Sequence, residues 1–82
     1  MSAKSILLEL SSALSVYDIA TSKYLKALSN KSLEEIAKDI NLWGGAGSIT
    51  DQISKNELTL INELSDYLSS KNISGIYKRI SN

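Results

Sequence analysis

The side chains that could do chemistry in this chain are limited to serines, lysines and carboxylates, because its 82 residues include no histidine and no cysteine. The serine–histidine and cysteine–histidine pairs of nucleophilic catalysis are therefore absent, as are disulfides and structural zinc sites. Ser54 and Lys55 are sequence neighbours, and on a helix their side chains point in different directions. The pair Glu34–Glu35 is typical of solvated charges on a helix surface. We therefore expect no catalytic residue, no cofactor and no enzymatic activity.

Two aspartates flank a glycine-rich segment and are the best candidates for holding a magnesium ion. Asp39 lies before the segment and Asp51 at its end. Helix-surface charge and N-terminal capping explain both residues about as well or better, and no HExxH, ExxH or EF-hand spacing occurs in the chain. We therefore predict no metal site.

The glycine-rich segment itself is the most unusual feature of the sequence. It holds the only tryptophan and three of the four glycines, which permit positive φ angles and close backbone approach. One interpretation is that its backbone amides and the following helix N-terminus bind a small anion such as phosphate, although the P-loop lysine is missing. The interpretation that we favour is a tight connection between helices, with the tryptophan packed over the end of the core. The residues concerned are Trp43, Gly44, Gly45, Gly47, Ser48 and Asp51.

The same segment resembles a known signature. Its W-G-G-A-G-S-I-T-D run is similar to an aromatic-G-G-M-G-S-[FL]-N-D-L pattern, from which it departs at Ala46, Thr50 and Gln52. That pattern occurs in a family of small helical bacterial proteins, some of which resemble the immunity partners of secreted toxins. The resemblance covers little more than this segment, and it implies a helical fold and no established activity.

A long first helix is the main element expected to position these residues. From about Ser2 to Leu28, apolar residues recur at alternating spacings of three and four, which is a heptad seam along one face of a helix. Ala13, Ala20 and Ala27 lie beside the seam at intervals of seven, and they would let another helix approach closely. Four further apolar residues fall off this face, and some of them must be covered by another element or another chain: Leu8, Val16, Ile19 and Leu25.

Two runs with the capping-box pattern predict where the next helices begin. The S-L-E-E run at Ser32 opens a second helix, which ends near Asn41, before the glycines. The S-K-N-E run at Ser54 opens a third helix over 55–70, and Asn72 is expected to cap a short last helix. The absence of proline leaves all of these helices uninterrupted.

The whole chain, 1–82, is therefore predicted to be one all-α domain: a small three- to four-helix bundle with a long first helix and a glycine-rich loop between helices 2 and 3. At this length a single core is barely sufficient, so the broad apolar face of the first helix indicates a protein-interaction module that pairs with itself or with another protein. The alternative is that the other helices cover this face within one chain. The expected interface residues lie along the seam: Leu10, Leu14, Tyr17, Ala20, Tyr24 and Leu28.

Charge and hydropathy argue against nucleic acids and membranes as partners. Nine basic and nine acidic residues cancel, and no basic stripe is visible. The apolar run Ile6–Leu8 is interrupted by Glu9 and is too short for a secretory or membrane-spanning segment, so a cytoplasmic location is expected. Two other functions stay open, a small-ligand or phosphate binder at Gly44–Ser48 and a toxin-immunity-type protein.

Overall fold

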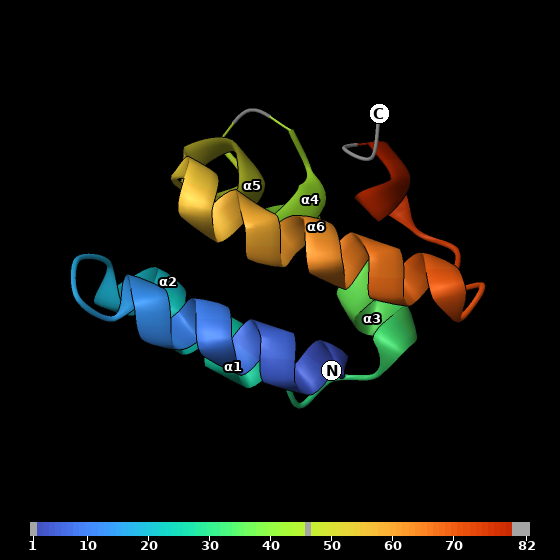
Figure 1. Ribbon diagram of the computed structural model, residues 1–82, viewed down its shortest axis with the longest axis horizontal. Helices are drawn as coiled ribbons and strands as arrows, with labels where there is room; N and C mark the ends of the chain where they lie inside the picture. The colour runs from blue at the N-terminus through green and yellow to red at the C-terminus, as the bar shows by residue number, and fades with distance from the viewer. Residues whose placement is uncertain (1, 46, 80–82) are drawn as a thin grey trace.

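The computed structural model describes residues 2–45 and 47–79, and throughout this part of the chain the regular structure is helical, without strands (Figure 1). This confirms the prediction of a small all-α bundle. Its elements, in chain order, are α1 (Ala3–Leu14), α2 (Ile19–Leu28), α3 (Leu33–Ala37), α4 (Ile40–Trp43), α5 (Ile49–Gln52), α6 (Lys55–Ser70) and the 3-10 turn η1 (Ile76–Arg79).

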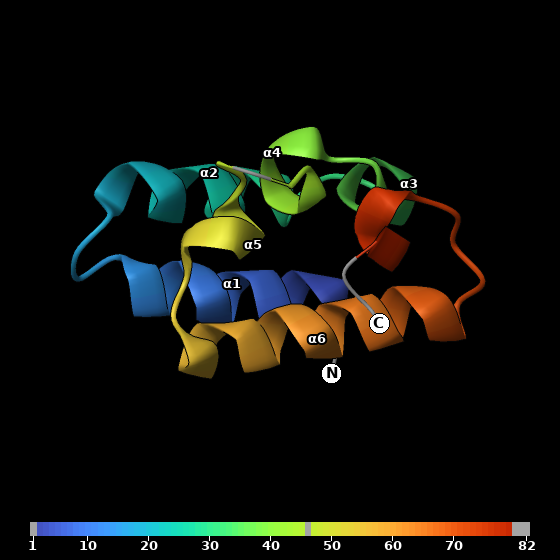
Figure 2. The ribbon, with the colours of Figure 1, turned by 90° about the horizontal axis from the view of Figure 1, so that it is seen from above.

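The helices form two layers. Helices α1 and α6 lie side by side in one layer, and α2, α3 and α4 lie in the other, with α5 and η1 at the margin between them (Figure 2). The most extensive contacts are those of α1 with α2 and of α1 with α6, so α1 is the helix around which the core is built. Its buried face includes Ile6, Leu7 and Leu10.

The chain turns back at residues 15–18, where a continuous helix was expected. The Ser15 hydroxyl donates to the Ser12 carbonyl at 2.7 Å beyond the end of α1. Asp18 then caps α2, because its carboxylate accepts from the Thr21 amide at 3.1 Å and from the Thr21 hydroxyl at 2.7 Å. The prediction of one helix from Ser2 to Leu28 is therefore wrong, and the second half of that segment folds back to cover the first.

A pair of buried serines joins α1 to α2. The Ser11 hydroxyl donates to the Ser22 carbonyl at 2.6 Å, and the Ser22 hydroxyl donates to the Ser11 carbonyl at 2.7 Å. The two side chains are small enough to let the helices approach closely, and each buried hydroxyl has a partner, as burial of a polar group requires.

The predicted second helix is also interrupted, whereas the third is confirmed. Asp39 ends the first stretch by capping α4, with its carboxylate accepting from the Leu42 amide at 2.8 Å. Helix α6 covers the predicted 55–70, and Ser54 and Glu57 form the expected capping box. These interruptions place the glycine-rich loop between α4 and α5 rather than after a single second helix.

Asn72 ends α6 instead of opening the last helix. It has a φ of 58°, and the amide of Ile73 donates to the Leu68 carbonyl at 3.1 Å while the Asn72 amide donates to the Ser69 carbonyl at 3.0 Å. This is a Schellman motif with asparagine in the left-handed position. The chain then crosses to η1 through Gly75, where an added Cβ would lie 2.3 Å from the Ala37 carbonyl oxygen.

Trp43 packs into the core against α3 and η1. Its side chain is buried, its Nε1 donates to the Ile36 carbonyl at 2.7 Å, and its ring lies 5.8 Å from that of Tyr77 at an interplanar angle of 56°. Tilted aromatic pairs of this kind are favourable. The favoured interpretation of the glycine-rich segment, with its tryptophan packed against the core, agrees with this position.

Candidate interaction face

The expected interface residues do not share one surface. Leu10, Leu14 and Leu28 are 0%, 1% and 4% exposed and belong to the core. The alternative weighed from the sequence, that other helices cover the seam within one chain, therefore holds for these three leucines. Tyr17 and Ala20 are exposed and Tyr24 is half-buried, so only the middle of the predicted seam reaches the surface.

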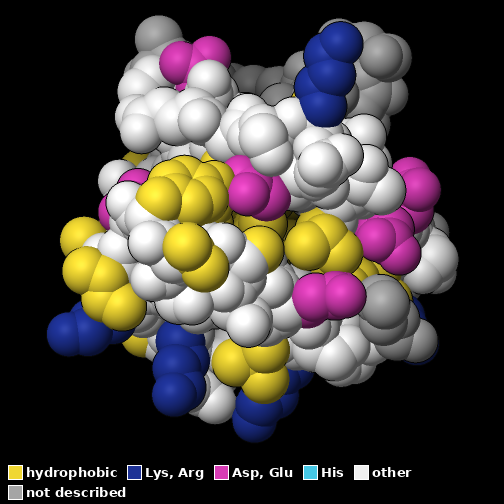
Figure 3. Space-filling view, turned by 60° about the vertical axis from the view of Figure 1, so that its left-hand side comes forward, with side chains coloured by type: hydrophobic (Ala, Val, Ile, Leu, Met, Phe, Trp, Pro, Cys, Tyr) yellow, Lys and Arg dark blue, Asp and Glu magenta, His cyan; other side chains and the backbone are white. Residues whose placement is uncertain are grey.

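Large apolar side chains are exposed at the corner between α1 and α2. Val16 is 87% exposed, Tyr17 63% and Ile19 58%, and we call these three residues the corner patch. Two of them, Val16 and Ile19, are among the residues that fell off the expected face, whereas Leu25 from the same set is buried in the core. Figure 3 shows hydrophobic side chains gathered across the middle of this end of the molecule, with lysine side chains along its lower edge.

A groove of about 490 Å³ runs between α2 and the α3–α4 segment. Its apolar lining comes from Tyr24, Ala27, Leu28 and Ile40, and we call it the α2–α4 groove. Ile40 is 69% exposed, although it belongs to a helix whose other apolar residues are buried. The groove therefore presents apolar surface that the described residues leave uncovered.

Tyr24 ties the two walls of this groove together. Its hydroxyl donates to the Asp39 carboxylate at 2.5 Å and accepts from the Asn41 amide at 3.1 Å. Partial burial raises the pKa of Tyr24, and its hydrogen bond to Asp39 raises that pKa further. The phenol is therefore neutral near pH 7, and it fixes the spacing of α2 and α4.

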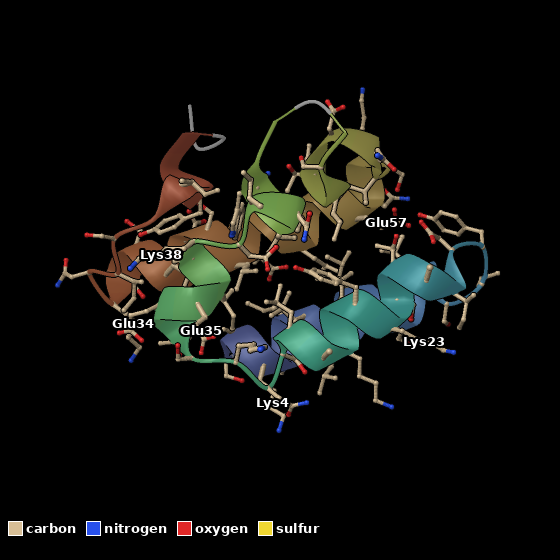
Figure 4. The ribbon with its side chains drawn as sticks, turned by 180° about the vertical axis from the view of Figure 1, so that it is seen from behind. Lys4, Lys23, Glu34, Glu35, Lys38 and Glu57 are labelled. Carbon is tan, nitrogen blue, oxygen red and sulfur yellow. The ribbon has the colours of Figure 1, made fainter. Side chains whose placement is uncertain are left out.

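The two walls differ in charge. Helix α2 carries Lys23 and Lys26 and no acidic residue, whereas Glu34 and Glu35 lie in the first turn of α3. Figure 4 looks onto this side of the molecule, with Lys23 at one end of it and the two glutamates at the other. Lys31 and Lys38 line the groove together with Glu35 and Asp39, so charges of both signs surround its apolar residues.

A second tyrosine links the corner patch to α6. The Tyr17 hydroxyl donates to Glu57 Oε1 at 2.5 Å, across 40 residues of sequence. This hydrogen bond is the main cause that raises the pKa of Tyr17 to about 12, with weaker contributions from burial and from the Glu57 charge. The same bond lowers the pKa of Glu57. No sequence signal connected these two positions.

The glycine-rich loop is closed by its own side chains. Gly45 and Gly47 have φ angles of 93° and 84°, which agrees with the expected positive φ. The Gly47 amide donates to Asp51 Oδ2 at 3.0 Å, and Gln52 Nε2 donates to the Gly47 carbonyl at 2.8 Å. The Ser48 hydroxyl pairs with that of Thr50 and does not cap α5.

This geometry does not favour anion binding by the loop. The Gly47 amide that a phosphate would need already donates to the Asp51 carboxylate. The negative charge of Asp51 would also repel an anion there. Gly44 has an ordinary φ and is needed for close packing instead. An added Cβ at this position would sit 2.2 Å from the Ile40 carbonyl oxygen. The loop acts as a tight connection in this structure.

The two aspartates considered as magnesium ligands already accept hydrogen bonds from other residues. Asp39 accepts from Tyr24 and from the Leu42 amide, and Asp51 accepts from Gly47. Among residues 2–45 and 47–79, no three acidic side chains are grouped as metal ligands would be. Within the same ranges, no helix has the length and apolar character needed to cross a bilayer.

Comparison of the chain with family models, curated proteins and solved structures finds no match. The resemblance of residues 43–51 to the bacterial signature, and the immunity-type function that goes with it, stay predictions.

Proposed function

We propose that this protein is a small protein-interaction domain that works in a homodimer or heteromer through the face around α2. The observation that carries the proposal is the exposure of Ile40 beside the α2–α4 groove, with Ile19 and Val16 exposed at the other end of α2. Single exposed apolar residues are common on protein surfaces. Several of them near one helix, in a domain this small, are typical of a contact surface.

The rest of the chemistry supports binding rather than catalysis. Four of the nine carboxylates hold the fold together: Asp18 and Asp39 cap helices, Asp51 closes the glycine-rich loop, and Glu57 accepts from Ser54 and Tyr17. None of them lines a buried cleft beside a nucleophile. A non-enzymatic role is therefore the proposal.

A photo-crosslinking residue placed at Ile40 tests this function in cells that make the protein. We expect a crosslinked adduct of defined mass, because the side chain at this position would lie inside the contact. The matched control carries the same residue at Asn62, which is exposed on α6 in the opposite layer. No adduct at position 40, or equal adducts at both positions, would overturn the proposal.

We further propose a cytoplasmic location in a bacterial cell. Fractionation of the same cells checks this. Recovery with the soluble cell contents supports the proposed location, and recovery with membranes or in the culture medium contradicts it.

A further inference from the structure

We infer that the corner between α1 and α2 is a hinge through which two copies of the chain can exchange α1, and that Asp18 holds this hinge closed. In the exchanged form, α1 and α2 of each copy make one straight helix, and α1 packs on α2 and α6 of the partner. The outer side of α2 stays uncovered in both forms, so the exchange does not depend on the proposed contact.

The backbone of the corner is already close to that of a helix. Ser15 has helical angles, with φ −60° and ψ −19°, and the Asp18 amide donates to the Leu14 carbonyl at 2.8 Å, in the helical i to i−4 pattern. Residues 15–18 include no glycine or proline, and none of them has a positive φ. Asp18 departs from the helix, with φ −146° and ψ 78°. The corner therefore opens by a change of backbone angles centred on Asp18, and it lies at one end of the molecule, beyond the ends of the other helices (Figures 1 and 2).

The buried residues of α1 and α2 share one face of such a straight helix. Leu7 and Leu25 are 18 residues apart, as are Leu10 and Leu28, and 18 residues make five turns at about 3.6 residues per turn. All four leucines are buried in the core. A hairpin does not require this alignment, whereas an exchanged helix does, because a partner then covers its whole apolar face from one side.

The buried serine pair selects a second copy of this chain as the partner. In the closed chain, the Ser11 and Ser22 hydroxyls each donate to the other residue's carbonyl. The two serines are 11 residues apart, about three turns, so they lie on the same face of the opened helix. Two such helices packed antiparallel place Ser11 of each copy against Ser22 of the other, and the pair forms twice. A partner of different sequence would leave these buried hydroxyls without their acceptors.

Asp18 opposes the exchange in two ways. It caps α2 in the closed chain, where its carboxylate accepts from the amide and the hydroxyl of Thr21. In the opened helix it lies 11 residues after Leu7 and seven before Leu25, in the middle of the apolar face. Pairing of residue 11 with residue 22 puts the two-fold axis between residues 16 and 17, so the two Asp18 carboxylates approach each other there. Charges without a partner in an apolar contact are costly, and a leucine at this position removes both obstacles.

An engineered cysteine pair tests the exchange, because the chain has no cysteine of its own. The Ser11 and Ser22 hydroxyls lie 2.9 Å apart, which is close enough for S11C/S22C to form a disulfide. With Asp18 in place, we expect the disulfide to close within one chain, which runs at 8.9 kDa on a denaturing gel without reductant. Adding Asp18→Leu should shift the main band to twice that mass, and reductant should return it to 8.9 kDa.

Three controls accompany this shift. Asp18→Asn keeps a polar acceptor at the cap and should leave the band at the monomer mass. S11C alone and S22C alone, each combined with Asp18→Leu, should also stay at the monomer mass, because position 11 faces position 22 and not itself. Circular dichroism shows that each variant is folded. If Asp18→Leu does not fold, Asp18→Met carries the same test with a more adaptable apolar side chain.

The outcomes separate the exchange from the proposed function. A monomer band for S11C/S22C with Asp18→Leu overturns the exchange, and a band at twice the mass with Asp18 in place overturns Asp18 as the residue that closes the hinge. A dimer held only by the face around α2 gives monomer bands on the denaturing gel while sedimentation equilibrium shows twice the mass, and the proposed function then stands without the exchange. A band at twice the mass with no crosslinked adduct at Ile40 leaves the exchange standing without the proposed function.

Discussion

Helices α1 and α2 come from one stretch of sequence with a single apolar spacing, yet they have different surroundings. Helix α1 buries Ile6, Leu7 and Leu10 between α2 and α6. Helix α2 covers α1 with one side and leaves Ile19 and Ala20 exposed on the other. A helix between two neighbours is closed on both flanks, whereas a helix at the edge of a layer keeps a free face. The difference places the candidate contact on α2 rather than on the buried face of α1.

Truncation of a residue in α1 should give the largest effect on stability. Leu10→Ala is expected to lower the free energy of unfolding by about 3 kcal/mol, because a fully buried leucine loses its contacts and leaves a cavity. Urea denaturation followed by circular dichroism measures the change. The matched control is Ile19→Ala in α2, which should change it by less than about 0.5 kcal/mol. Equal losses for the two variants would remove the distinction between the helices.

A smaller loss of stability is expected from a substitution at the contact between α1 and α2. Ser22→Ala removes the hydroxyl that donates to the Ser11 carbonyl and leaves that carbonyl buried without this donor. The expected cost is about 1 kcal/mol, measured by the same denaturation. Thr59→Ala removes a hydroxyl on an exposed turn of α6 and serves as control. If the serine variant is as stable as the parent, the serine pair does not hold the helices together.

The sequence was most informative where a helix has both of its ends encoded locally. Helix α6 was predicted at its observed bounds because Ser54 and Glu57 cap its start, even though the role of Asn72 was misread. The break at residues 15–18 was missed because the heptad spacing continues through it. Nothing local distinguishes one long helix from two that fold together, except Asp18 as a cap ahead of Thr21.

The candidate face was predictable only in part. The spacing of Ala20 and Ala27 and the unplaced Val16 and Ile19 indicated a contact near α2, and these residues are exposed. The groove was not predictable, because it depends on the position of α4 against α2. That position is fixed by contacts between distant residues, such as the bond from Tyr24 to Asp39.

Removal of the cap at the turn should weaken α2 more than α1. Asp18→Ala is expected to lower the midpoint of thermal unfolding, because the amide and hydroxyl of Thr21 lose their acceptor. Those bonds, the hydroxyl first, lower the pKa of Asp18 below its ordinary 3.8. A lowered carboxyl pKa adds stability that is present above pH 3.8 and is lost as the pH falls through the folded value. The gap between parent and variant should therefore close in strong acid.

Hydrogen exchange locates the effect of this variant. Amides of α2 should lose protection in Asp18→Ala while amides of α6 change less. Asp18→Asn keeps an acceptor and should lie between the parent and the alanine variant. Uniform loss across all helices would mean that the turn contributes to the whole fold and does not separate α1 from α2.

The smallest effect is expected from the bond between the corner patch and α6, because this bond is exposed to solvent. The bond to Glu57 raises the pKa of Tyr17 from 10.0 to about 12. A raised pKa means that the protonated phenol adds stability that is complete below pH 10 and is lost as the pH rises towards 12. Tyr17→Phe should therefore show less alkaline destabilisation than the parent over this interval. Ultraviolet absorbance checks the cause, since one tyrosine fewer should ionise near pH 12. If the variant instead loses a tyrosine that ionises near pH 10, Tyr17 does not hold Glu57 in solution, and the corner patch is independent of α6.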